Sequence, residues 1–123
     1  SLHYKISGRN YDLYELQARM QEFCNKYFLP AKVVRNIELL TEEVIQISPI
    51  DDGAELILEY SESTDQLTMQ LQVPYKGLVL ESEEGPDMLS MAIINNICSE
   101  VKEERLSDDT LGLFFTLKGM NKK

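Results

Sequence analysis

The stretch AELILEYSESTDQLTMQLQVP, residues 54–74, decides the fold class of this chain. Apolar side chains occupy every second position over 56–60 and again over 67–73. A period of two is typical of strands that bury one face. The polar run 61–65 between these segments predicts a hairpin loop, and Pro74 ends the second strand. The stretch therefore predicts an antiparallel β-hairpin.

Upstream of the hairpin, the sequence predicts one strand followed by two amphipathic helices. Apolar and polar residues alternate over 2–6, which indicates a half-buried strand. From Asp12, a candidate N-cap, apolar residues recur at spacings of three and four as far as about Phe28. A second such series starts at Pro30 and ends before Pro49, because proline disfavours helical geometry in the residue that precedes it.

After the hairpin, we expect a loop, a third helix and a last strand. Residues 74–87 contain two prolines, two glycines and several acidic residues, a composition that predicts a mobile loop. The third helix is expected to begin near Pro86 and to be closed by the charged residues 102–105. Alternation over 111–117 predicts the last strand. The inner stripe of the third helix is expected to consist of Met91, Ile94, Cys98 and Val101.

The predicted order of elements is strand, helix, helix, strand, strand, loop, helix, strand. Elements with one apolar face each fit an α+β fold, a two-layer α/β sandwich with three helices on one face of a mostly antiparallel, four- to five-stranded sheet. A length of 123 residues fits a single domain that spans residues 1–123. The sequence starts at Ser1 without a methionine, so we leave open that the domain is cut from a longer protein.

Charge and composition disfavour several classes of protein. The chain has 12 basic and 21 acidic residues and a formal charge of −9, which disfavours nucleic acid and anionic membranes as partners. No apolar run approaches the roughly 18 residues of a membrane helix, so no membrane insertion is expected. Cys24 and Cys98 fit a reduced, cytoplasmic core better than a disulfide framework or a zinc site. With His3 as the single histidine, a nucleophilic triad is not expected.

Three short segments carry a resemblance to a known family. They are TEEVIQ at 41–46, VPYKG at 73–77 and GPDMLSM at 85–91. These segments and the order of the elements resemble the ATPase domain shared by gyrase, heat-shock chaperones and histidine kinases, the GHKL superfamily. Within it, the chain is most similar to the bacterial anti-sigma-factor serine kinases. The resemblance implies the histidine-kinase-like ATPase fold and, where the family's activity is retained, ATP and magnesium as cofactors.

The first segment corresponds to the helix that carries the family's general base and magnesium ligand. The resemblance assigns Glu42 to the catalytic base and Gln46 to the place of the asparagine that holds the metal. Side chains four residues apart lie about 5 to 6 Å from one another on one helix face, so both can address one ligand. Gln46 is one methylene longer than asparagine, which changes where its oxygen meets a cation. Without the resemblance, Glu42 would be interpreted as part of a solvated helix face.

The other two segments correspond to the adenine-binding and phosphate-binding parts of the family. Tyr75 stands where the family has the aspartate that accepts a hydrogen bond from the adenine amino group, and Gly77 matches a nearby glycine. Gly85 and Ser90 lie in the segment whose backbone amides receive the phosphates. A phenol cannot reproduce the acceptor geometry of a carboxylate, and an acidic loop disfavours a triphosphate. These departures predict that no cofactor is bound.

The same departures favour one function over two alternatives. The predicted function is a degenerate ATPase-like domain that acts as a regulatory protein-binding module, whose partner protein presents a basic surface to the acidic loop. One alternative is a divergent ATP- and magnesium-dependent serine kinase or ATPase that uses Glu42 and Gln46. The other is a cytosolic regulatory domain attached to a larger signalling or transporter ATPase. Homodimerisation is left open.

Overall fold

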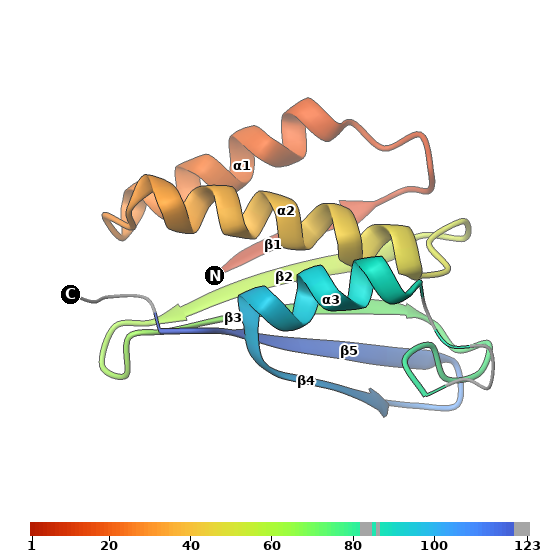
Figure 1. The fold of residues 1–123 in the computed structure, drawn as a ribbon. Coiled ribbons are helices and arrows are strands. Elements are labelled where there is room, and N and C mark those ends of the chain that lie inside the picture. The colour runs from red at the N-terminus through yellow and green to blue at the C-terminus, as the bar shows by residue number, and fades with distance from the viewer. Residues whose placement is uncertain (82–84, 86, 120–123) are drawn as a thin grey trace.

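The computed structural model, which describes residues 1–81, 85 and 87–119, contains three helices and one five-stranded antiparallel sheet (Figure 1). The order of the strands across the sheet is β1-β2-β3-β5-β4. Every neighbouring pair is antiparallel. The elements are β1 (Leu2–Ile6), α1 (Leu13–Lys26), α2 (Ala31–Ile47), β2 (Ala54–Ser61), β3 (Gln66–Pro74), α3 (Met88–Ile97), β4 (Cys98–Arg105) and β5 (Thr110–Leu117).

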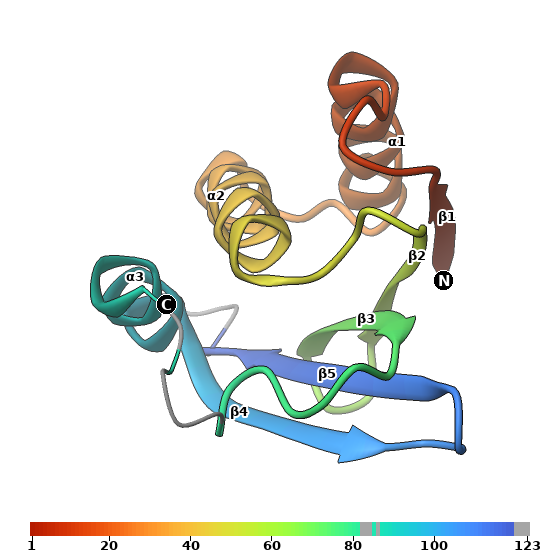
Figure 2. The same ribbon diagram turned by 90° about the vertical axis from the view of Figure 1, so that its right-hand side faces the viewer.

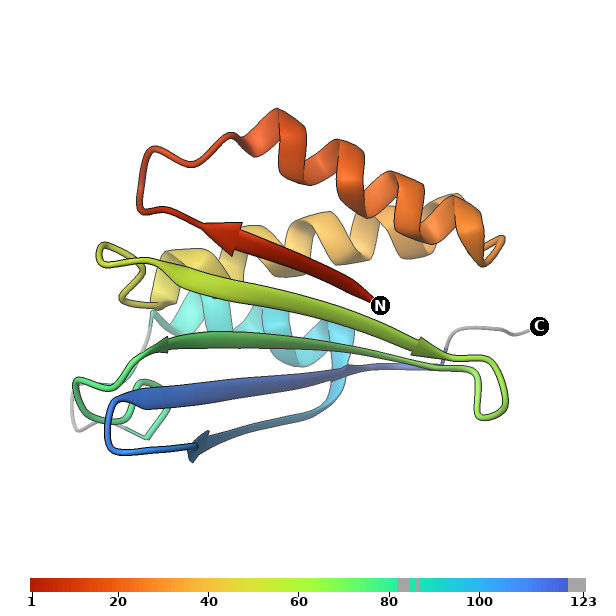
Figure 3. The same ribbon diagram turned by 180° about the vertical axis from the view of Figure 1, so that it is seen from behind.

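The helices form one layer and the sheet forms the other. Figure 2 shows α1, α2 and α3 along one side of the twisted sheet, and Figure 3 shows the opposite face with no described helix in front of it. The predicted α+β class, with three helices on one face of an antiparallel sheet, is therefore confirmed. Among the described helices, none has the length and apolar composition that crossing a membrane requires.

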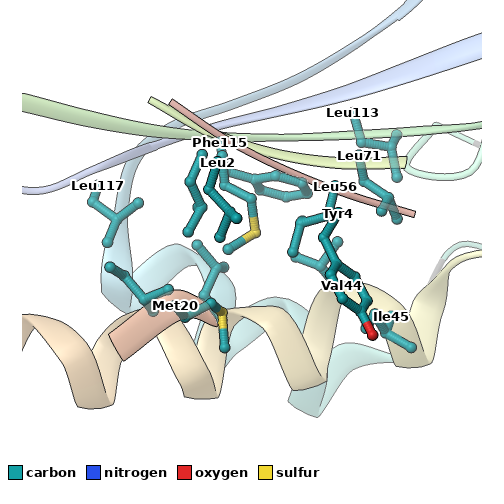
Figure 4. Close-up of a cluster of buried hydrophobic side chains, with 14 of the residues drawn as sticks. Leu2, Tyr4, Met20, Val44, Ile45, Leu56, Leu71, Leu113, Phe115 and Leu117 are labelled. Carbon is teal, nitrogen blue, oxygen red and sulfur yellow. The ribbon is translucent and has the colours of Figure 1, made fainter. Parts of the chain in front are cut away.

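The β2–β3 hairpin forms the centre of the core, as its periodicity predicts. Leu56 of β2 lies opposite Leu71 of β3, and both side chains are fully buried. Figure 4 shows that Leu113 and Phe115 of β5 join the same cluster, which packs against Val44 of α2. The core therefore lies between the sheet and the helices, and the polar residues of the strands point to the uncovered face.

The third helix is shorter than predicted, which corrects the interpretation of the sequence. α3 ends at Ile97, and residues 98–105 form β4 at the edge of the sheet instead of the end of a helix. The helical spacing of Cys98 and Val101 has another origin, because a bulge between Cys98 and Glu100 places both opposite buried residues of β5. A bulge adds one residue to a strand, so three-residue spacing in β4 imitates the spacing in a helix.

The predicted irregular stretch 74–87 is described in part. Residues 75–81 form neither helix nor strand, as predicted. Residues 82–84 and Pro86 lie outside the described residues, and the mobility of this stretch stays a prediction. α3 begins at Met88, because Asp87 is its N-cap.

Both cysteines are free and buried, as predicted for core thiols. Burial raises the pKa of Cys24 to about 11 and that of Cys98 to about 12. A thiol reacts as the thiolate. Both cysteines therefore stay protonated and unreactive at neutral pH.

Candidate functional site

The structure brings two of the three resemblance segments together at one end of the molecule. The 75–81 segment, which contains Tyr75 and Gly77, lies near the start of α3 (Figure 1). Gly85 precedes α3, and Ser90 lies in its first turn. Glu42 and Gln46 lie on the last two turns of α2. The end of the molecule that contains the 75–81 segment and the start of α3 is the candidate site.

Glu42 and Gln46 are both solvent-exposed on α2. Tyr11 lies between β1 and α1, and its pKa is raised first by burial and second by the Glu42 carboxylate. Glu38, one turn earlier, likewise contributes after burial to the raised pKa of Cys24 on α1. Both carboxylates therefore influence acidic groups of α1 and of the loop before it. Within the described chain, neither Glu42 nor Gln46 forms a hydrogen bond with α3 or with the 75–81 segment.

The first amides of α3 are bound by a carboxylate of the chain itself. Asp87 Oδ1 accepts hydrogen bonds from the Leu89 amide at 2.7 Å and from the Ser90 amide at 3.3 Å. The free amides at a helix start are what makes this position suitable for phosphate. Here they are capped, and Ser90 itself is buried. A phosphate at the start of α3 would have to displace the Asp87 carboxylate.

A second carboxylate occupies the amides of the 75–81 segment. Glu103 Oε2 accepts from the amides of Val79 at 2.8 Å and Leu80 at 3.0 Å, and Glu103 Oε1 accepts from the amide of Glu81 at 2.8 Å. Consecutive backbone amides that converge in this way form an anion-binding nest. Glu103 lies on β4 and is half-buried. The nest at this end is therefore filled by a side chain of the sheet.

Tyr75 is held against the β4–β5 hairpin. The Arg105 guanidinium lies 3.9 Å from the centroid of its ring, a cation–π contact. The Tyr75 amide donates to the Asp109 carbonyl at 2.8 Å. Next to it, Lys76 Nζ contacts Asp52 Oδ2 at 2.6 Å, which raises the pKa of Lys76 and lowers that of Asp52. Tyr75 is thus part of the attachment of the 75–81 segment to the sheet.

The surface beside these contacts is apolar and acidic. Met88 and Leu89 are 87% and 71% exposed, and Leu78 is 41% exposed. Glu81, in the 75–81 segment, and Asp87, which precedes Met88, are exposed acids. We call Met88 and Leu89 the apolar patch. Exposed apolar side chains that adjoin charged residues are typical of protein-binding surfaces.

Two residues that attach the 75–81 segment to the sheet, Glu103 and Arg105, could not be found by reading the sequence. The sequence interpretation placed 102–105 at the end of a helix, whereas the structure places both side chains on β4 beside the 75–81 segment. Their contacts join segments more than twenty residues apart. No local pattern indicates such a contact.

Within residues 1–81, 85 and 87–119, no group of three or more His, Cys, Asp or Glu side chains is arranged to hold a metal ion. Gln46, the predicted metal ligand, is exposed on α2. The assignment of a metal to Gln46 stays a prediction.

No model of a known protein family matches the chain, and no curated protein matches it either. The function must therefore be argued from the geometry of the candidate site.

Proposed function

We propose that this chain is a regulatory protein-binding domain, related in fold to the GHKL ATPases, in which nucleotide binding is weak or lost. One observation carries the proposal: the carboxylates of Asp87 and Glu103 bind the backbone amides at the end of the molecule where the resemblance puts the phosphates. Amides that already bind an internal anion are not available to an external one.

Electrostatics adds to this obstruction. Glu81, Asp87 and Glu103 lie in or beside the segments that would surround a triphosphate. Each carboxylate about 4 Å from a unit negative charge costs about 1 kcal/mol in bulk water, and more in a closed pocket. The chain as a whole carries a formal charge of −9. Both the local and the total charge oppose the entry of ATP.

The positions of the remaining family residues support the same proposal. Tyr75 carries a phenol in place of a carboxylate, and its ring is engaged by Arg105. Among the described residues, Glu42 forms no hydrogen bond with the 75–81 segment or with α3, and its carboxylate contributes to the raised pKa of Tyr11. A general base has to reach the group from which it takes a proton. The serine-kinase alternative therefore has less support than a binding function.

The apolar patch and its carboxylates indicate the chemistry of the partner. Met88 and Leu89 supply contact area, and Glu81 and Asp87 supply negative charge beside it. Acidic groups around an apolar centre steer a partner with the opposite charge. We propose a cytoplasmic protein with a basic surface as this partner, met by the domain alone or as part of a larger signalling protein.

Isothermal titration calorimetry with ATP and magnesium tests the loss of nucleotide binding. We expect no heat beyond that of dilution. A parallel titration with magnesium pyrophosphate separates the phosphate-binding claim from the loss of adenine recognition, and we expect no heat there either. A saturable titration with micromolar affinity for ATP would contradict the proposal.

A further inference from the structure

A groove of about 880 Å³ lies at the end of the molecule opposite the 75–81 segment. Its walls come from the turn between α1 and α2, the loop of the β2–β3 hairpin, the last turn of α3 and the end of β5. In Figure 1, this is the end where the α1–α2 turn and the tip of the β2–β3 hairpin lie. None of the residues assigned to nucleotide chemistry lines it.

Phe28 stands at the rim of this groove in a conformation that favours glycine. α1 ends at Lys26, and Phe28 follows with a φ of 57° and a side chain that is 92% exposed. The amides of Phe28 and Leu29 donate to the carbonyls of Asn25 and Cys24, which is the Schellman pattern of helix ends. Glycine would adopt this geometry without strain. The phenyl ring therefore contributes little burial to the folded domain and is available for contact with another molecule.

The groove is cationic on an acidic protein. Lys32 and Lys118 line it from α2 and from the residue after β5. Neither lysine forms an ion pair with any residue in the described part of the chain. Asp65 is the one acid among the described lining residues, and its carboxylate accepts a hydrogen bond from the Tyr60 hydroxyl. The charge of the groove is thus complementary to an acidic ligand.

Two carboxamides on different helices line the same groove. Asn36 lies on α2, and Asn96 lies on the last turn of α3. Among the described residues, neither carboxamide has a hydrogen-bond partner. A carboxamide offers a donor and an acceptor side by side, which matches the donor and acceptor of a peptide group. The pair is suited to an extended backbone that passes between the two helices.

The exposure of Phe28 favours a polypeptide over a small molecule as the occupant. A compound seated in the groove would leave a ring with 92% exposure mostly in water. A polypeptide can lie in the groove and also cover the ring with an apolar side chain. Aromatic residues are enriched where proteins bind one another.

We propose that this groove binds an extended acidic segment of a partner protein, with Lys32 and Lys118 on its carboxylates, Asn36 and Asn96 on its backbone, and Phe28 on an apolar side chain. This inference does not rest on the loss of nucleotide binding. It assigns a surface distinct from the apolar patch and a partner segment of the opposite charge.

Selection from a random peptide library displayed on phage tests the proposal. The most enriched peptides are synthesised with a fluorescent label, and their affinity for the intact domain is measured by fluorescence anisotropy. We expect them to combine Asp or Glu with apolar residues. We expect the double variant Lys32→Glu, Lys118→Glu to weaken their binding by about tenfold or more.

Matched variants separate loss of binding from loss of fold. Phe28→Gly is expected to weaken peptide binding while it raises the melting temperature, because glycine relieves the backbone conformation. Lys5→Glu, an exposed lysine on β1, and Tyr14→Ala, an aromatic side chain that is 83% exposed on α1, are expected to leave the affinity unchanged.

Three outcomes would overturn the proposal. The selected peptides could be basic or neutral, or their affinity could be indifferent to the groove variants. The library could also yield no peptide that binds the domain. In that case the anionic dye anilinonaphthalene sulfonate provides a further probe: if it binds the wild type and is lost in the lysine double variant, the groove is a site for small anions and not for a peptide.

Discussion

Glu103 binds three consecutive backbone amides of the 75–81 segment with one side chain. Its carboxylate accepts from three consecutive amides at 2.8 to 3.0 Å. Hydrogen bonds to an ionised group are about twice as strong as those between neutral groups. The 75–81 segment has no helix or strand of its own. Its attachment to the sheet therefore depends on side chains such as Glu103 and Arg105.

Glu103→Ala is expected to lower the free energy of unfolding by about 1–3 kcal/mol, because three amides lose their acceptor. Urea unfolding followed by circular dichroism measures this change. Hydrogen exchange should also become faster at Val79, Leu80 and Glu81. The control is Glu104→Ala, which removes the exposed acid at the next position of β4. Equal effects of the two variants would show that the contacts of Glu103 carry no particular weight.

The free energy of unfolding is expected to fall at alkaline pH, because the thiols of Cys24 and Cys98 and the phenol of Tyr4 stay protonated in the folded state. Burial raises the pKa of Cys24 to about 11 and that of Cys98 to about 12, and burial followed by Glu15 raises that of Tyr4 to about 12. In the unfolded chain the pKa of a thiol is about 8.5 and that of a phenol is about 10. Above about pH 8.5, the unfolded state therefore loses protons that the folded state keeps, so the free energy of unfolding decreases as pH rises.

Urea unfolding at a series of pH values from about 7 to about 10.5 measures this dependence. A Cys24→Ala, Cys98→Ala double variant provides the comparison, because it removes two of the three groups. Its stability should fall less steeply with pH than that of the wild type. Identical slopes would mean that the folded state does not raise the pKa of the two thiols.

The elements differ in how far the sequence predicts them. The β2–β3 hairpin could be predicted because its alternation reflects one buried face, and Leu56 and Leu71 are indeed buried opposite each other. β4 could not, because the bulge at Cys98 produces a helical spacing in a strand. Arg105, which contacts the Tyr75 ring, lies on that strand. The arrangement of the candidate site therefore could not be predicted from the sequence either.

The start of α3 depends on its N-cap. Asp87→Ala removes the acceptor of the Leu89 and Ser90 amides and is expected to lower the free energy of unfolding by about 1 kcal/mol. Asp87→Asn should retain most of the stability, since asparagine is also a good N-cap. Chemical denaturation of both variants checks the prediction. Asp108→Ala, which removes an exposed acid of the β4–β5 turn, is the control. A neutral effect of Asp87→Ala would contradict the capping role.

The molecule as a whole has two ends of different chemical character, joined by one core. The 75–81 segment and the start of α3 carry carboxylates and the apolar patch, while the groove at the other end carries Lys32 and Lys118 (Figure 1). A single hydrophobic cluster contains residues of strands β1, β2, β3 and β5 and of helices α1, α2 and α3. One core therefore holds the two proposed binding surfaces in a fixed relation to each other.

Because one core supports both ends, a core substitution is expected to destabilise the whole domain. Leu113 is fully buried in the sheet. Leu113→Ala should lower the free energy of unfolding by about 2–5 kcal/mol in a single cooperative transition. Leu89→Ala, which truncates a side chain that is 71% exposed, should have little effect. Two separate transitions, or equal losses in both variants, would contradict a shared core.

The proposed function depends on the carboxylates of Glu103 and Asp87, which accept from backbone amides at the end of the molecule where the resemblance would put a nucleotide. A ¹⁵N-labelled sample titrated with ATP and magnesium tests it most directly, because NMR reports separately on the amides of Val79, Leu80, Glu81, Leu89 and Ser90. We expect these five signals to keep their positions throughout the titration. Saturable shifts of these same signals would show that ATP displaces Glu103 and Asp87, and would contradict the proposed function.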